Sequence, residues 1–200
     1  MYHDRVLAVP SAMIANPHFP TPPEIAKGLV LLEIQHFNFA GIIKTGHIIV
    51  HQLVLPDVRQ FFSLAFRLRF PIHSVRTVNE FGWDEIATNL ANNSSGQNMR
   101  NIVGTTGLLN KLSKHAIGCA FDINPVQNPY YVLDEQTLEL QQVIPSNARY
   151  VPGSPGTLHN GHPLVRLMIE RGWAWGGNWT FPVDYQHFQI VPPELASWVK

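Results

Sequence analysis

The sequence predicts a single α+β domain in which a central antiparallel sheet is flanked by helices. Its 200 residues suit one domain, and a hydrophobic fraction of 45% is sufficient for a buried core. Sixteen prolines and 14 glycines favour many turns and short elements. Strand-like and helix-like stretches mix without the regular strand–helix–strand rhythm of a doubly wound fold, so α+β is the better prediction.

The first half of the chain contains an arm, two strands and a helix. Residues 1–40, which are rich in proline at their start, are expected to form an N-terminal arm packed on the domain, and residues 41–200 to form the domain itself. The β-branched, apolar run 46–55 is typical of a strand. Apolar residues at helical spacing predict a helix over 57–70, and residues 71–78 resemble a second strand.

The second half is less regular. Asn, Ser and Gly predict a loop over 89–107, and a short strand over 118–125 ends at a proline. Residues 124–160 hold many prolines and polar residues, which predicts a long irregular excursion. A helix is expected over 162–173, with a proline in its first turn and a glycine at its end. A last strand follows around the stretch HFQIV.

Composition excludes several classes of partner. Charged residues make up only 14% of the chain and the formal net charge is zero, so neither nucleic acid nor an anionic membrane is expected to bind. The single cysteine rules out an internal disulfide. No apolar run reaches the roughly 18 residues of a membrane-spanning helix. The N-terminal residues lack the basic start of a signal peptide, so none is predicted within this chain.

The stretch SKHAIGCAFD, residues 113–122, places polar side chains in an otherwise apolar segment. On one straight strand His115 and Asp122 would lie about 23 Å apart, so they can share an ion only if the chain bends between them. Gly118 can supply that bend. Beyond it, strand alternation puts Phe121 on an apolar face and Asp122 on the opposite face.

A second polar cluster, DYQHFQ, contains Asp184 and His187. The two clusters together offer two histidines and two carboxylates. A catalytic zinc site uses three protein ligands and an open water position, with a nearby carboxylate that accepts a proton. That count fits, but each short pattern alone also occurs by chance, with His187 as a core histidine and Asp122 as a turn cap.

The joint pattern resembles the zinc D-alanyl-D-alanine carboxypeptidase family, which includes the vancomycin-resistance dipeptidases and the phage L-alanyl-D-glutamate endopeptidases. Five residues match its SxHxxGxAxD motif: Ser113, His115, Gly118, Ala120 and Asp122. The companion motif, an acid three residues before a histidine near the C-terminus, is formed by Asp184 and His187. The resemblance extends over roughly residues 40 to 190.

The resemblance implies a role for each matched residue. His115, Asp122 and His187 are expected to bind one zinc ion on one face of the sheet, in a hedgehog/DD-peptidase-like fold. Asp184 corresponds to the general base and acid, and is aspartate as in the endopeptidase branch. Arg100 corresponds to the arginine that lies over the scissile carbonyl, where a guanidinium stabilises developing negative charge.

Other polar and aromatic residues have more than one reading. Ser113 is expected to hydrogen-bond near the site, with loop capping almost as good an explanation, and Trp175 and Trp179 are candidates for a substrate groove, although aromatics after a helix are more often core. Four histidines are interpreted as non-catalytic, with a secondary metal site in the loop HNGH as the alternative for the last two: His47, His51, His159 and His162. Cys119 is interpreted as a packing residue.

The resemblance implies zinc-dependent hydrolysis of a peptide bond in bacterial peptidoglycan stem peptides. It does not separate a D-Ala-D-Ala carboxypeptidase from a dipeptidase or an L-Ala-D-Glu endopeptidase. The alternative is a non-catalytic, zinc-stabilised binding module of the same fold. An enzyme of this kind is expected outside the cytoplasm of a bacterium, in the periplasm or cell wall, or as a phage lysin. The sequence predicts no particular oligomeric state.

Overall fold

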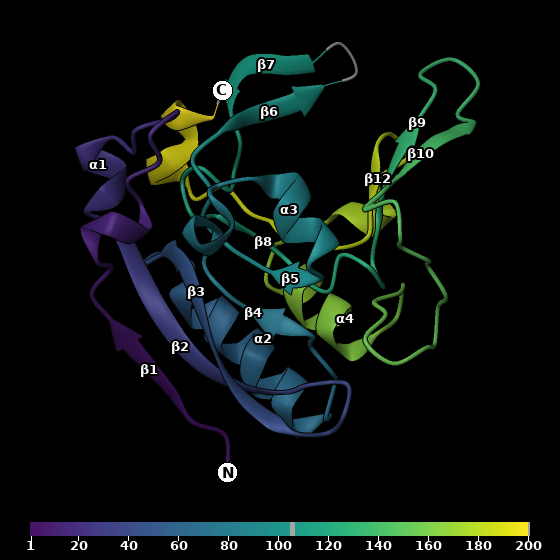
Figure 1. Ribbon diagram of the computed structural model, residues 1–200, viewed down its shortest axis with the longest axis horizontal. Helices are drawn as coiled ribbons and strands as arrows, with labels where there is room; N and C mark the ends of the chain where they lie inside the picture. Colours follow the sequence, from purple (N-terminus) through teal and green to yellow (C-terminus); the bar gives the residue numbers. More distant parts are fainter. Residues whose placement is uncertain (105–106, 200) are drawn as a thin grey trace.

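The computed structural model describes residues 1–104 and 107–199, and it has the predicted α+β character (Figure 1). The α-helices are α1 (Pro23–Ala26), α2 (Leu55–Arg67), α3 (Glu85–Leu90) and α4 (Pro163–Glu170). Short 3₁₀ helices are η1 (Ser11–Met13), η2 (Val78–Phe81), η3 (Gly176–Asn178) and η4 (Pro193–Trp198). The strands are β1 (Asp4–Leu7), β2 (Leu29–Phe37), β3 (Ile43–His51), β4 (Ser74–Val75), β5 (Asn93–Ser94), β6 (Asn101–Gly104), β7 (Gly107–Leu112), β8 (Ala120–Asp122), β9 (Tyr130–Leu133), β10 (Leu140–Ile144), β11 (Ala174–Trp175), β12 (Val183–Asp184) and β13 (His187–Gln189).

The antiparallel strands are distributed over several small sheets, and this corrects the prediction of one central sheet. The sheets have the strand orders β1-β2-β3, β11-β13-β8 and β10-β9-β12, with the pair β6-β7 beside them. The pair β4-β5 is parallel. Most of these strands are only two to six residues long. Prolines and bends interrupt them before they can extend into one continuous sheet.

The hairpin of β2 and β3 is the longest regular feature of the fold. Its nine antiparallel pairs run from Leu29 opposite His51 to Phe37 opposite Ile43, and β1 adds a third strand along β2. The expected boundary between residues 40 and 41 falls in the turn of this hairpin. Residues assigned to the arm therefore pair directly with residues assigned to the domain.

Helix α2 packs its apolar side on the β2–β3 sheet and on α4 (Figure 1). Val58, Phe61, Phe62 and Ala65 recur at the spacing of one helical face, and all four are buried. The sequence placed this helix over 57–70 and the second long helix over 162–173, and both are confirmed with ends shifted by a few residues. Among the described residues, no helix is long and apolar enough to cross a membrane.

Two segments are more ordered than the sequence predicted. The irregular excursion 124–160 contains the hairpin of β9 and β10, and the loop 89–107 contains β5 and β6. The strand expected over 71–78 is reduced to β4. Pro129 lies just before β9 and Pro145 just after β10, where prolines break the pattern of alternation from which longer strands are recognised.

The paired strands β8 and β13 pack one face on the hydrophobic core. Phe121 of β8 stacks on Phe188 of β13 with ring centres 5.1 Å apart, and Phe61 of α2 meets both rings edge-on. All three phenylalanines are fully buried. A rigid aromatic layer thus lies directly beneath the backbone that carries Asp122 and His187.

His162, which caps the N-terminus of α4, should make the protein less stable at mildly acidic pH. His162 accepts a hydrogen bond from the backbone N–H of Leu164, and burial lowers its pKa to about 4. The unfolded chain binds a proton near pH 6.5. The unfolding free energy should therefore fall as the pH decreases from about 6.5 towards 4, because only the unfolded state takes up this proton.

Replacing His162 by Asn keeps a helix-capping acceptor and removes the titration. Urea unfolding at pH 7 and pH 4.5 should show a smaller pH-dependent loss for His162→Asn than for the unchanged protein. The exposed His18→Asn variant is the control and should keep the original dependence. An identical pH dependence in all three proteins would contradict the assignment.

Candidate metal centre

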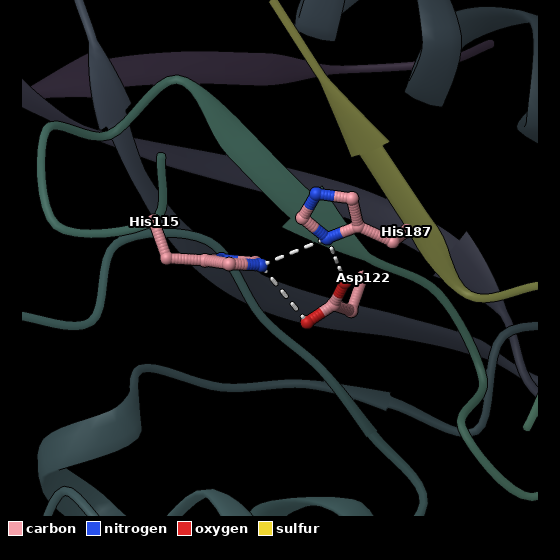
Figure 2. A group of neighbouring side chains, drawn as sticks. All are labelled: His115, Asp122 and His187. Carbon is pink, nitrogen blue, oxygen red and sulfur yellow. Dashed lines mark hydrogen bonds and ion pairs between the residues drawn. The ribbon is translucent and has the colours of Figure 1, made fainter. Parts of the chain in front are cut away.

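Three buried side chains from distant parts of the chain converge at the end of the core: His115, Asp122 and His187 (Figure 2). His115 Nε2 lies 3.2 Å from Asp122 Oδ2 and 3.1 Å from His187 Nδ1. His187 Nδ1 lies 3.0 Å from Asp122 Oδ1. The structure thus brings together the three residues that the sequence singled out as metal ligands.

A tight turn before β8 directs His115 back towards that strand. The hydroxyl oxygen of Ser113 accepts a hydrogen bond from the backbone N–H of His115, which holds the start of the turn. Gly118 completes it with a φ of +70°, a conformation that glycine adopts without strain. The bend required between His115 and Asp122 is therefore present at the predicted residue.

The pairing of β8 with β13 places the other two side chains. Asp122 lies directly opposite His187, and Phe121 directly opposite Phe188. Opposed residues of an antiparallel pair project to the same face, so the carboxylate and the imidazole meet on one side while the two phenylalanines enter the core.

The outer nitrogen of each histidine is held by an oxygen atom. His115 Nδ1 lies 2.7 Å from the carbonyl oxygen of Gly96, and His187 Nε2 lies 3.1 Å from Gln189 Oε1. A carbonyl oxygen only accepts, so each outer nitrogen donates, and in the neutral form of each imidazole the inner nitrogen presents a lone pair. Metal-binding histidines are usually oriented by such partners.

These lone pairs and the Asp122 carboxylate create a site for a cation. Two imidazole nitrogens and a carboxylate oxygen are a donor set that Zn²⁺ uses, and in a tetrahedral zinc site the ligand atoms lie about 3.3 to 3.6 Å apart. The separations of 3.0 to 3.2 Å here are shorter by only a few tenths of an ångström. The residues therefore fit a metal ion of this type.

Electrostatic coupling within the group keeps the carboxylate ionised. Burial raises the pKa of Asp122, but the charges that His115 and His187 carry when protonated, and the hydrogen bonds they then donate, outweigh it and hold this pKa well below its usual range. Burial lowers the pKa of His187, and the hydrogen bond and charge of Asp122 reverse that shift and raise it. A positive charge among these groups is strongly favoured.

Asp184 lies beside the group without joining it. It ends β12, while His187 begins β13 after a two-residue turn. Its Oδ1 atom is buried and has no hydrogen-bond partner among the described residues. Burial raises the pKa of Asp184 to about 7, against the opposing charge of His187 and together with the charges of Asp122 and Glu85. A carboxylate with a pKa near neutrality can both accept and return a proton.

Arg100 lines a small cavity next to the three converging side chains. The cavity is also lined by Val78, Glu85, Thr88, Asn89, Ser95, Asn98, His115 and Asp122. Arg100 forms an ion pair of 2.7 Å with Glu85, and its Nε has no partner among the described residues. The guanidinium that the sequence placed near the scissile bond therefore lies at the edge of the candidate metal centre.

The two tryptophans lie in different surroundings. Trp179 is partly exposed, with its ring 5.5 Å from that of His187, so it lies beside the group. Trp175 is only 2% exposed, and its indole N–H donates to the carbonyl oxygen of Tyr185. The expectation that Trp175 lines a groove is therefore corrected, because its ring packs in the core and supports the turn before His187.

The four histidines interpreted as non-catalytic, and the cysteine, lie outside the metal group and contact other parts of the fold. His47 pairs with Glu33, and His51 is buried against Gly28. The rings of His159 and His162 meet edge to face just before α4, with their centres 5.3 Å apart. The metal-type group found among the described residues contains none of these four. Cys119 is fully buried in the core, and burial raises the pKa of its thiol to about 12.

Several contributors to the site were not predicted from the sequence. Gln189 lies two residues beyond His187 on the same strand face, a spacing that could have been read as an orienting partner. Tyr130 lies directly opposite Asp184 in the β9–β12 pair. Glu85 and the Gly96 carbonyl reach the site through tertiary folding, and no local pattern marks either of them.

Comparison with known proteins supports the motif. A family model described as D-alanyl-D-alanine carboxypeptidase matches residues 107–190, and the resemblance to that family is thereby confirmed over this segment, while its extension back to residue 40 stays a prediction. The segment contains the three converging residues and Asp184, whereas Arg100 lies outside it. No curated protein and no solved structure gives a significant match to the chain. The matched family is one of peptidases, which are hydrolases.

Removing one of the converging side chains should abolish tight metal binding. We expect His115→Ala to weaken Zn²⁺ binding by more than about 100-fold, since loss of orienting partners alone typically costs 10- to 100-fold. Gln189→Ala should fall within that smaller range. Isothermal titration with Zn²⁺ measures both affinities. His47 of β3 forms an ion pair with Glu33 of β2 outside the site, so the His47→Ala variant should bind Zn²⁺ as the unchanged protein does. Equal affinity for His115→Ala and His47→Ala would contradict this site.

The bend at Gly118 should be intolerant of any side chain. A Cβ there would lie 2.7 Å from the backbone nitrogen of His51 and 2.7 Å from Leu29 Cδ2, at a φ already unfavourable for alanine. Gly118→Ala should lower the unfolding free energy by at least about 1–3 kcal/mol. Gly153→Ala has a similar φ but open space, so the difference between the two in urea unfolding isolates the clash. A Gly118→Ala variant no less stable than Gly153→Ala would show that the turn can relax.

Proposed function

We propose that this protein is a zinc-dependent peptidase that hydrolyses a peptide bond in the stem peptides of bacterial peptidoglycan. The proposal starts from the D-alanyl-D-alanine carboxypeptidase match of residues 107–190. Its activity is of the D-Ala-D-Ala carboxypeptidase or L-Ala-D-Glu endopeptidase type, and it uses one zinc ion held by His115, Asp122 and His187. The fold around this ion is of the hedgehog/DD-peptidase type.

The observation that carries the proposal is the number of candidate ligands. His115, Asp122 and His187 form a group of three, and among the residues described no fourth His, Cys, Asp or Glu joins it. Structural zinc sites are usually closed by four protein ligands, whereas catalytic sites have three and leave one position for water or substrate. Asp184, close by but outside the group, is then available for proton transfer.

Each residue has a defined task in the proposed reaction. The chemistry that zinc supplies at such a site is activation of water and polarisation of the scissile carbonyl. Asp184 accepts the proton of the attacking water and returns it to the leaving amine, which its pKa of about 7 favours. The Arg100 guanidinium, held in place by Glu85, stabilises negative charge on the carbonyl oxygen.

The competing function is a zinc-stabilised binding module without catalysis. It has the same three ligands but requires the fourth position to be closed. The unpartnered Oδ1 of Asp184 favours the enzyme, because a buried oxygen left without a hydrogen bond costs stability and such costs are concentrated at functional sites. Because its proposed substrate is peptidoglycan, we expect the protein to act in the periplasm or cell wall of a bacterium, or to be a phage lysin.

The function is tested with the zinc-loaded protein and pentapeptide-bearing muropeptides, with products identified by mass spectrometry. Loss of one D-alanine identifies a carboxypeptidase, and release of D-Ala-D-Ala a dipeptidase. Cleavage after the first L-alanine identifies an endopeptidase. Absence of every product from protein with zinc bound would contradict the proposed activity and favour the binding module.

Asp184 separates catalysis from metal binding. Asp184→Ala should reduce turnover by about 100- to 10,000-fold, the usual contribution of a general acid–base group, while zinc remains bound. Zinc content is measured by metal analysis on the same samples. Asp134→Asn is the matched control, since this partly exposed aspartate accepts hydrogen bonds from the backbone N–H groups of Gln136 and Thr137 in the β9–β10 turn and is not part of the site. Loss of zinc from Asp184→Ala would instead identify Asp184 as a ligand.

A further inference from the structure

Asn98 occupies an unusual position in the cavity beside the metal centre. It is only 5% exposed, and it lines the cavity together with Arg100, His115 and Asp122. Its side-chain Oδ1 is buried and has no hydrogen-bond partner in the part of the chain that the structure describes. A buried acceptor left unpaired is costly, and such a group is completed by an ordered water, an ion or a bound ligand.

The backbone around Asn98 is fastened to the elements of the site. The N–H of Asn98 donates to the carbonyl oxygen of His115, and the N–H of Gln97 donates to that of Ile49 in β3. Ser95 exchanges two backbone hydrogen bonds with Asp122. Asn98 is thus held in a fixed relation to two of the proposed metal ligands, as a preorganised binding group must be.

The chemistry of the cavity indicates what Asn98 meets. An amide oxygen accepts a hydrogen bond, so its partner must be a donor. A substrate carbonyl placed at the metal centre brings further backbone N–H groups close by, because successive residues of a peptide are about 3.8 Å apart. The neighbouring Asn89 also lines the cavity and is equally buried, but it has no orphaned atom.

From this arrangement we infer that Asn98 positions the substrate, with its Oδ1 accepting a hydrogen bond from a main-chain N–H next to the scissile bond. The inference rests on the proposed peptidase function and extends it to substrate binding. Asn98 takes no part in proton transfer. Its contact is made with the substrate before and during the reaction, so it contributes to binding more than to the chemical step.

The test combines a protein variant with a substrate variant. Wild type, Asn98→Ala and Asn89→Ala, all loaded with zinc, are compared on the cleaved stem peptide and on analogues N-methylated at one peptide nitrogen flanking the scissile bond. On the unmodified peptide, Asn98→Ala should lower kcat/KM about 10-fold or more, mainly through KM. One N-methyl analogue should weaken wild type similarly and should affect Asn98→Ala little further.

Asn89→Ala is the matched control and should respond to N-methylation as wild type does. If Asn98→Ala and wild type lose the same factor on every analogue, the inferred hydrogen bond does not exist, although the peptidase function stands. The same comparison of protein variants and N-methylated peptides is repeated for binding affinity. Calorimetry measures it with the variants placed in the zinc-loaded Asp184→Ala protein, which should not cleave the peptides. If wild type neither cleaves nor binds any of these peptides, the proposed function and this inference are both wrong.

Discussion

The antiparallel pairing of β8 with β13 is the constraint on which the site depends. Its register sets Asp122 opposite His187 on one face and Phe121 opposite Phe188 on the other. A slip of one residue would place Phe188 opposite Asp122 and turn His187 towards the core. The stacked phenylalanines and the edge-on ring of Phe61 disfavour that slip, because it would remove buried aromatic surface.

The same pairing links packing to electrostatics. A carboxylate and two histidines are gathered at a place where burial would ordinarily exclude charge. Gly96 and Gln189 fix the outer nitrogens, so the neutral imidazoles direct the lone pairs of their inner nitrogens towards the Asp122 carboxylate. Without a positive charge between them, the carboxylate and the two imidazole lone pairs repel one another, and holding them together costs free energy of folding. A bound metal ion relieves that cost.

Much of the site was predictable from short patterns, while the sheet arrangement was not. The bend at Gly118 and the alternation beyond it follow from local geometry, and they place His115 and Asp122 correctly. His187 could be added because the two motifs match one family. By contrast, the burial of Trp175, the ion pair of Arg100 with Glu85 and the division of the strands into several sheets depend on contacts between distant segments. Strands of two or three residues carry too little periodicity to be located from sequence.

The central claim is that one ion binds between β8, β13 and the turn before β8, with a coordination position left open. The most direct measurement is a crystal structure of the zinc-loaded protein with anomalous diffraction at the zinc edge. The account predicts one peak, bonded to His115 Nε2, a carboxylate oxygen of Asp122 and His187 Nδ1, with a water molecule as the fourth ligand and Asp184 within hydrogen-bonding distance of that water. A peak elsewhere, or a fourth bond from Asp184 or another side chain, would contradict it.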